Sequence, residues 1–144
     1  MTPEMSKTTT ALVTAEPLEL AAHERAVEHR SAGAVVSFAG VVRDHDGGRG
    51  VVDLEYEAHP SAGAVLAEIA AEIAADESVY ALAVSHRVGR LEIGDVALAA
   101  AVSTAHRAEA FALCARLVDE VKARLPVWKR QVFTDGDEEW VNCP

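Results

Sequence analysis

The sequence predicts an α+β fold: a mixed, mainly antiparallel sheet with three helices packed on it, in a single domain. The chain has 144 residues, which is the size of one ordinary domain with one core. Half of the residues are apolar but only 5% are aromatic, so the core is expected to consist mostly of Ala, Val and Leu. Segments rich in β-formers occur in hairpin-like pairs that helical segments interrupt, and this order is typical of α+β folds.

The N-terminal half is expected to hold three strands and one helix. Residues 1–10 are polar and rich in threonine, so we expect a flexible tail there and a folded domain over residues 11–144. Val52, Leu54 and Tyr56 alternate with acidic residues, which predicts a strand with one buried face. The expected elements are an edge strand over 11–14, a helix over 17–30, a strand that begins at 33, a mobile Gly-rich loop over 44–50 and a strand over 51–59.

The C-terminal half is expected to hold two helices separated by strands. A helix over 60–77 carries Val65, Ile69 and Ile73 at spacings of four. Strands are expected over 79–88 and 96–104, with a turn region between them. A second helix over 106–125 ends because Pro126 cannot sit in a helix interior. Its start is expected to be capped by Ser103 or Thr104, its core residues are Phe111, Leu117, Val118 and Val121, and strands follow over 127–133 and 139–141.

The charge distribution excludes some partners and suggests others. A net charge of −10 argues against nonspecific binding to nucleic acids and to anionic membranes. No apolar run is long enough to span a bilayer and the N-terminus is a poor signal peptide, so a cytoplasmic protein is expected. Residues 105–130 nevertheless carry six Lys and Arg against three acids. This basic segment suggests a small anionic ligand or the carboxylate of a partner.

Two lysines mark the most informative segment. The chain has only three lysines against ten arginines, and two of them, Lys122 and Lys129, lie on either side of Pro126. Lysine differs from arginine because it can lose its proton when desolvated and act as a base or nucleophile. The two ammonium groups can converge across the corner that Pro126 makes. The alternative is a cation at a helix end and a solvated strand residue.

Other basic residues are weaker candidates. His106 and Arg107 open a helix, where backbone N–H groups favour a phosphate, although incidental charges explain them equally well. Arg43 at a strand end can hold an anion, or it is an ordinary surface arginine. A solvated turn explains His86, Arg87 and Arg90 better than a binding site does.

Metal and cofactor chemistry is not expected. Asp44, His45 and Asp46 resemble a metal cluster only superficially, because no further ligands follow at suitable spacing. The two cysteines are too few and too far apart for a metal cluster, and Cys114 fits a small buried residue on a helix.

These segments together resemble the large, catalytic subunit of molybdopterin synthase. Each motif is weak alone, but their order and spacing over residues 16–141 are specific. The matching stretches are GAVVSFAGVVRDHDGG (33–48), LEYEAHP (54–60), SHRVGRLEIGD (85–95), STAHRAEAF (103–111), DEVKARLPVWKRQVF (119–133) and GDEEWV (136–141).

The resemblance implies a sulfurtransferase and its partners. That family inserts two sulfurs into cyclic pyranopterin monophosphate and so makes the molybdopterin dithiolene of the molybdenum cofactor. The sulfur arrives as a thiocarboxylate on the C-terminal Gly-Gly of a small ubiquitin-like subunit. Two large subunits form a homodimer with one small subunit at each end, a heterotetramer, and the enzyme uses no metal or cofactor.

The resemblance also implies site residues, which either lie within one subunit or are partly shared across the dimer. Lys122 and Lys129 are the implied catalytic residues and also contact substrate. The other implied substrate-binding residues are Val41, Val42, Arg43, His106, Arg107, Arg130 and Gln131. The alternative is a non-catalytic module that binds a ubiquitin-like tail or a phosphorylated metabolite, in which arginine would serve as well as either lysine.

Overall fold

Four strands of seven to nine residues form one sheet. In this computed structural model, which describes residues 7–142, the sheet has the order β1-β5-β7-β2. β1 is parallel to β5, and the other pairs are antiparallel. The strand bounds are Thr8–Thr14 for β1, Ala34–Val41 for β2, Val79–Arg87 for β5 and Val96–Thr104 for β7.

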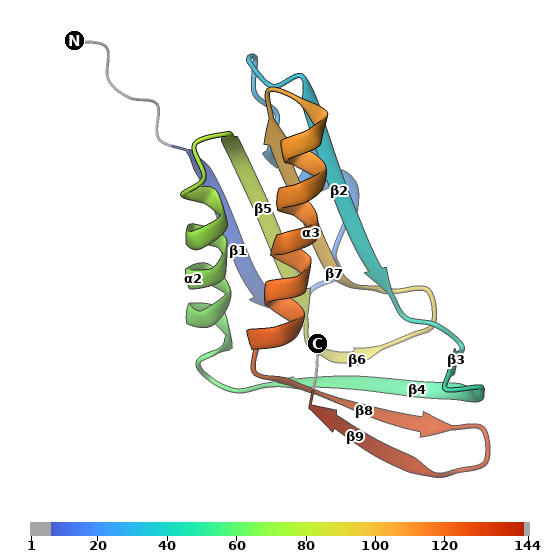
Figure 1. Cartoon of the computed structure of the whole chain (residues 1–144). Coiled ribbons are helices and arrows are strands. Elements are labelled where there is room, and N and C mark those ends of the chain that lie inside the picture. The colour runs from blue at the N-terminus through green and yellow to red at the C-terminus, as the bar shows by residue number, and fades with distance from the viewer. Residues whose placement is uncertain (1–6, 143–144) are drawn as a thin grey trace.

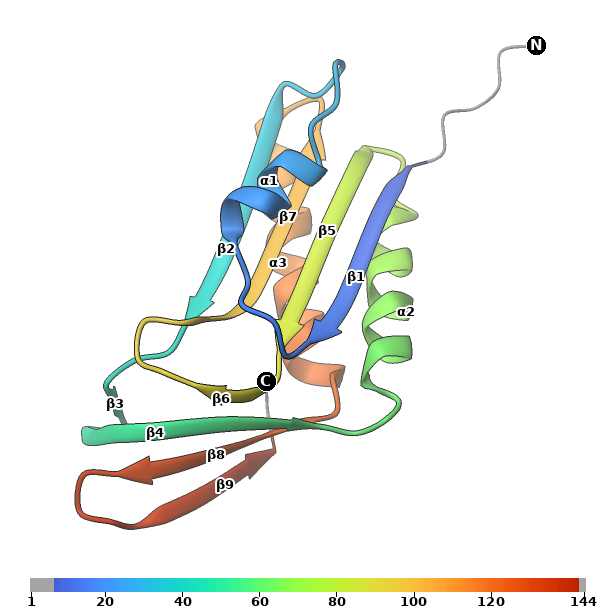
Figure 2. The same cartoon turned by 180° about the vertical axis from the view of Figure 1, so that it is seen from behind.

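Three helices cover the two faces of this sheet. α2 (Ala62–Ala74) and α3 (Arg107–Arg124) lie on one face (Figure 1), and α1 (Leu20–Ala26) lies on the other (Figure 2). The main core lies between the sheet and the helix pair, where Ile69, Leu82 and Leu117 are fully buried. Packing therefore holds α3 firmly against the sheet along its length.

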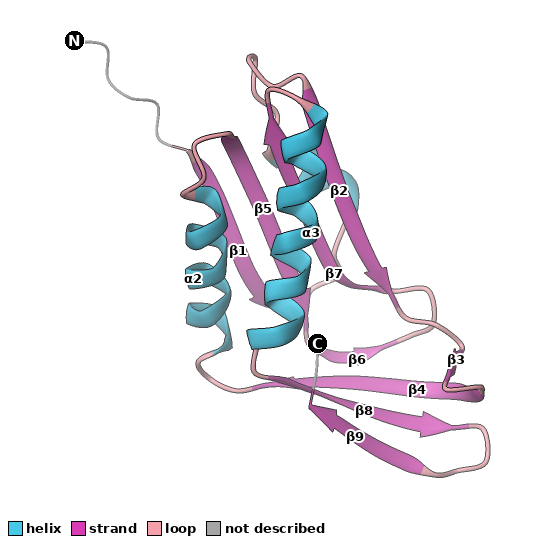
Figure 3. Cartoon of the chain, viewed as in Figure 1, coloured by secondary structure: helices cyan, strands magenta, loops and turns pink. Residues whose placement is uncertain are grey.

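A second sheet lies across one end of the first (Figures 1 and 3). It has five strands but fewer residues than the first, so we call it the small sheet and the first one the large sheet. The order of the small sheet is β3-β4-β8-β9, with β6 also paired to β4, and every pair is antiparallel. The fold class expected from the sequence is confirmed, although the strands divide into two sheets. The bounds are His45–Asp46 for β3, Arg49–Ala58 for β4, Gly89–Leu91 for β6, Val127–Phe133 for β8 and Glu138–Asn142 for β9.

Several boundaries differ from the sequence prediction. Most of the expected tail, residues 1–6, lies outside the described residues, and β1 already begins at Thr8 because its backbone pairs with β5. The first helix is much shorter than 17–30. The prediction of a mobile loop over residues 44–50 is wrong. Gly47 and Gly48 in this segment have positive φ and join β3 to β4 in a tight hairpin.

Three local predictions are also wrong. Val52 is 55% exposed because a register shift between Val51 and Asp53 turns its side chain outward. Phe111 was expected in the core but is 60% exposed on α3. No side chain caps α3, since the Thr104 hydroxyl donates to the carbonyl of His106 rather than accepting from a helix N–H.

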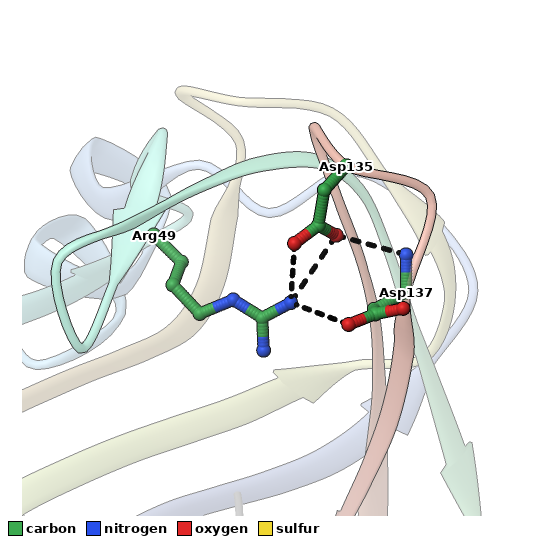
Figure 4. A network of polar contacts seen from close by, with 3 residues as sticks. All are labelled: Arg49, Asp135 and Asp137. Carbon is green, nitrogen blue, oxygen red and sulfur yellow. Dashed lines mark hydrogen bonds and ion pairs between the residues drawn. The ribbon is translucent and has the colours of Figure 1, made fainter.

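An ion-pair network joins the two hairpin turns of the small sheet (Figure 4). The guanidinium of Arg49 at the start of β4 contacts Asp135 at 2.9 Å and Asp137 at 3.1 Å, both in the turn between β8 and β9. It also lies 3.8 Å over the ring centroid of Phe133. These contacts fix the β3–β4 hairpin relative to β8.

No helix among residues 7–142 is both long and apolar enough to cross a membrane.

Candidate active site

A pocket of about 290 Å³ opens where the small sheet meets the end of the large sheet. We call it the lysine pocket, because Lys122 and Lys129 both line it. The predicted residues Val41, Val42, Arg43 and Gln131 line it as well. The remaining lining residues are Gly40, His45, Asp46, Leu54, Tyr56, His86, Ala97 and Leu98.

The two lysines reach this pocket from consecutive elements. Lys122 stands in the last turn of α3, and the extended backbone of Leu125 with Pro126 then turns the chain into β8. Successive side chains of a strand point to opposite faces, so Lys129 and Gln131 share the inner face of β8. The convergence that the Pro126 corner suggested is therefore present within one chain.

The segment after β2 forms another wall of the pocket. The N–H of Val42 donates to the carbonyl of Asp95, and its carbonyl accepts from Gly94. These two bonds fasten the segment to the turn before β7. Arg43 follows at the pocket rim, and its guanidinium lies 3.5 Å from a carboxylate oxygen of Asp46.

Asp46 adds a negative charge to the pocket, and the sequence had not predicted a role for this residue in the site. The other oxygen of its carboxylate accepts a hydrogen bond of 2.8 Å from Nε2 of Gln131. This bond, together with the positive charges of Lys129 and Arg43, lowers the pKa of Asp46 below its ordinary value. The carboxylate is therefore ionised at neutral pH.

His86 is a second residue that sequence reasoning missed. It is 1% exposed although it was expected in a solvated turn, and its ring lies edge-on to the ring of Tyr56. Burial lowers its pKa to about 4, with a smaller contribution from the charge of Lys122. Its Nδ1–H donates to the carbonyl of Arg87 at 2.8 Å, which leaves Nε2 as a hydrogen-bond acceptor. The β-rich run over 79–88 was the available signal that this position is buried.

Three of the predicted site residues do not line the pocket of their own chain. Arg130 points to the outer face of β8 and pairs with Glu138. His106 and Arg107 stand at the start of α3, fifteen residues from Lys122. At 1.5 Å per residue, the step from Arg107 to Lys122 corresponds to about 22 Å along the helix.

Across residues 7–142, no three side chains of His, Cys, Asp or Glu are grouped to hold a metal ion. The pocket instead gathers Lys, Arg and His around one carboxylate, an arrangement suited to an anionic, hydrogen-bonding ligand.

Known proteins are similar to this chain in sequence and fold. The family model described as MoaE protein matches residues 13–124. A molybdopterin synthase catalytic subunit from Nostoc sp. is 38% identical over 132 residues, which cover 90% of this chain and 80% of the relative. A longer subunit of the same name from Oryza sativa subsp. indica is 41% identical, and the match covers 83% of this chain but 63% of that one.

A solved structure with a related name also matches this chain. The crystal structure of molybdopterin synthase from Staphylococcus aureus superimposes with a TM-score of 0.82 and 31% identity, covering 96% of this chain and 98% of the other. The family model covers most of the chain, and the sequence and structural matches extend over nearly all of it. The chain therefore belongs to the MoaE protein family.

Proposed function

We propose that the protein is the catalytic subunit of molybdopterin synthase, an enzyme of molybdenum cofactor biosynthesis that acts in the cytoplasm. It inserts two sulfurs into cyclic pyranopterin monophosphate and so makes the dithiolene of molybdopterin. The observation that carries this proposal is the convergence of Lys122 and Lys129 in one pocket. Relatives that match 83% to 90% of this chain carry the name of that subunit.

The pocket provides suitable chemistry for this substrate. A phosphate and the polar edges of a pterin require charged donors, which Arg43 and the two lysines supply. Lys122 neutralises the thiocarboxylate and orients its sulfur for attack. Lys129 moves a proton or stabilises charge while bonds of the ring and the phosphate rearrange.

The sulfur donor in this proposal is a second, small subunit. Its ubiquitin-like body ends in Gly-Gly, and the C-terminal thiocarboxylate on this tail enters the lysine pocket. The opening of the pocket between two sheets suits an extended tail, which has no side chains at its last two residues. Support for a partner comes from the relatives, whose shared name describes them as a subunit.

A homodimer of large subunits would complete the site. β2 is the last strand of its sheet, and it begins beside Thr104 and ends just before Arg43. Two copies packed with their β2 strands antiparallel would bring His106 and Arg107 of one copy toward Arg43 of the other. In this arrangement the start of α3 supplies phosphate-binding groups in trans. One small subunit at each end then gives a heterotetramer.

Reconstitution tests the proposal. The protein is mixed with a thiocarboxylated small subunit and cyclic pyranopterin monophosphate, and the dithiolene product is measured. We expect product in proportion to the thiocarboxylate supplied. If a small subunit that is competent with another synthase gives no product here, the chain is instead a non-catalytic module that binds the tail or a phosphorylated metabolite.

A further inference from the structure

One carboxylate stands among the cations of the lysine pocket. Of the described residues that line it, Asp46 alone is acidic, and its side chain is 37% exposed at the rim. Its neighbours in the wall include Arg43, Lys129 and Gln131. A pocket that only had to bind a phosphate and a thiocarboxylate would bind both more strongly without this negative charge.

The carboxylate is held in a fixed position. Gln131 is 2% exposed, and its Nε2 donates to one oxygen of Asp46 at 2.8 Å. The tight β3–β4 hairpin carries Asp46, and Arg49 ties the end of this hairpin to the turn after β8. The contact of Arg43 at 3.5 Å is long for a hydrogen bond. A carboxylate has about four acceptor positions, so Asp46 retains capacity for further donors.

We propose that Asp46 is a specificity-determining residue that accepts hydrogen bonds from the amino-pyrimidinone edge of the pterin. This edge presents a ring N–H and an exocyclic amino group side by side, a pair of donors that matches the two oxygens of a carboxylate. The cations of the pocket then face the phosphate and the thiocarboxylate. This inference rests on the proposed function, since it assumes a pterin substrate.

A different role for Asp46 makes a different prediction. If the carboxylate only balanced the charges of Arg43 and Lys129, its removal would strengthen the binding of every anion. It would not change the choice between two ring systems that differ only in their donors. Ring selectivity is therefore the decisive measurement, and affinity for inorganic phosphate is the reference.

The test compares 6-hydroxymethylpterin with 6-hydroxymethyllumazine, in which an oxo group replaces the 2-amino group. Calorimetry gives the affinity of the wild-type protein, of Asp46→Asn and of the control Asp44→Asn for both compounds and for inorganic phosphate. Asp44 precedes the same hairpin but is exposed and lies outside the pocket lining. We expect the wild type and the control to prefer the pterin by roughly tenfold, as for one good paired hydrogen bond. Asp46→Asn loses that preference, because its amide N–H₂ faces another donor.

Two outcomes overturn the inference. One is a wild-type protein that binds both compounds equally, a result that needs no variant to fold. The other is an Asp46→Asn variant that keeps the pterin preference while phosphate binds more tightly. If either occurs while reconstitution still yields the dithiolene, only the role of Asp46 fails. If neither compound binds and no product forms, the proposed function fails as well.

Discussion

Burial of His86 predicts a specific loss of stability in acid. The folded protein holds the pKa of His86 at about 4, whereas its ordinary value is 6.5. As the pH falls through 6.5, the unfolded chain takes up a proton at this position and the folded chain does not. Stability from the neutral ring is therefore fully present above pH 6.5 and is lost progressively down to pH 4.

The expected loss of stability follows from the difference between the pKa values of His86 in the folded and unfolded chain. Each pKa unit corresponds to about 1.4 kcal/mol, so this one group removes about 3 kcal/mol of unfolding free energy between pH 7 and pH 4. The ring contacts Tyr56 and lies near the charge of Lys122. Both the desolvation and this positive neighbour disfavour the imidazolium, which is why the shift is downward.

Urea unfolding at pH 7 and pH 4 measures the effect in the wild type and in His86→Gln. Glutamine does not titrate, so the wild type should lose about 3 kcal/mol more than the variant over this interval. Carboxylates titrate in both proteins and cancel in the comparison. His59→Gln makes the same change at an exposed histidine and serves as the control. An equal pH dependence for wild type, His86→Gln and His59→Gln would show that burial of His86 does not weaken the protein in acid.

Two further predictions concern the hairpins and the dimer. Arg49→Ala removes the contacts with Asp135 and Asp137, so it should speed amide hydrogen exchange in the turn around Gly136. Exchange in α2 should stay unchanged. Unchanged exchange in the turn would contradict the role of the network. Arg107→Ala and Lys122→Ala should each be inactive alone, yet a mixture after subunit exchange should regain part of the activity. This recovery follows if one dimer site receives Arg107 from one copy and Lys122 from the other, and its absence after verified exchange would argue against a shared site.

Local rules predicted the parts of the site that lie close together in the chain. Pro126 must end a helix, and the period of two along β8 then directs Lys129 and Gln131 to one face. These constraints act over a few residues, so the convergence of Lys122 and Lys129 was one of two interpretations that the sequence allowed, whereas Gln131 was named by family resemblance. β7 and β8 were predicted at the bounds that the structure has, since their β-branched and apolar residues are unambiguous.

Other parts of the site depend on pairings between distant segments. Asp46 and Gln131 meet only because β4 pairs with β8, which carries Gln131, and the sequence does not reveal this pairing. His86 is buried because the small sheet closes over the end of β5, and Tyr56 comes from that sheet. His106 and Arg107 were named by family resemblance, and nothing within one chain brings them to the pocket.

The rate of dithiolene formation by Lys122→Ala measures what this lysine contributes to sulfur transfer. Arg116→Ala is the matched control, because it removes a cation from the same helix outside the pocket lining. Both variants are first shown to be folded and to have the same oligomeric state as the wild type. We expect Lys122→Ala to lose roughly a hundredfold or more of the rate, the usual scale for a group that assists proton or charge transfer, while Arg116→Ala keeps the wild-type rate. A Lys122→Ala protein that forms the dithiolene at the wild-type rate would show that Lys122 has no catalytic role.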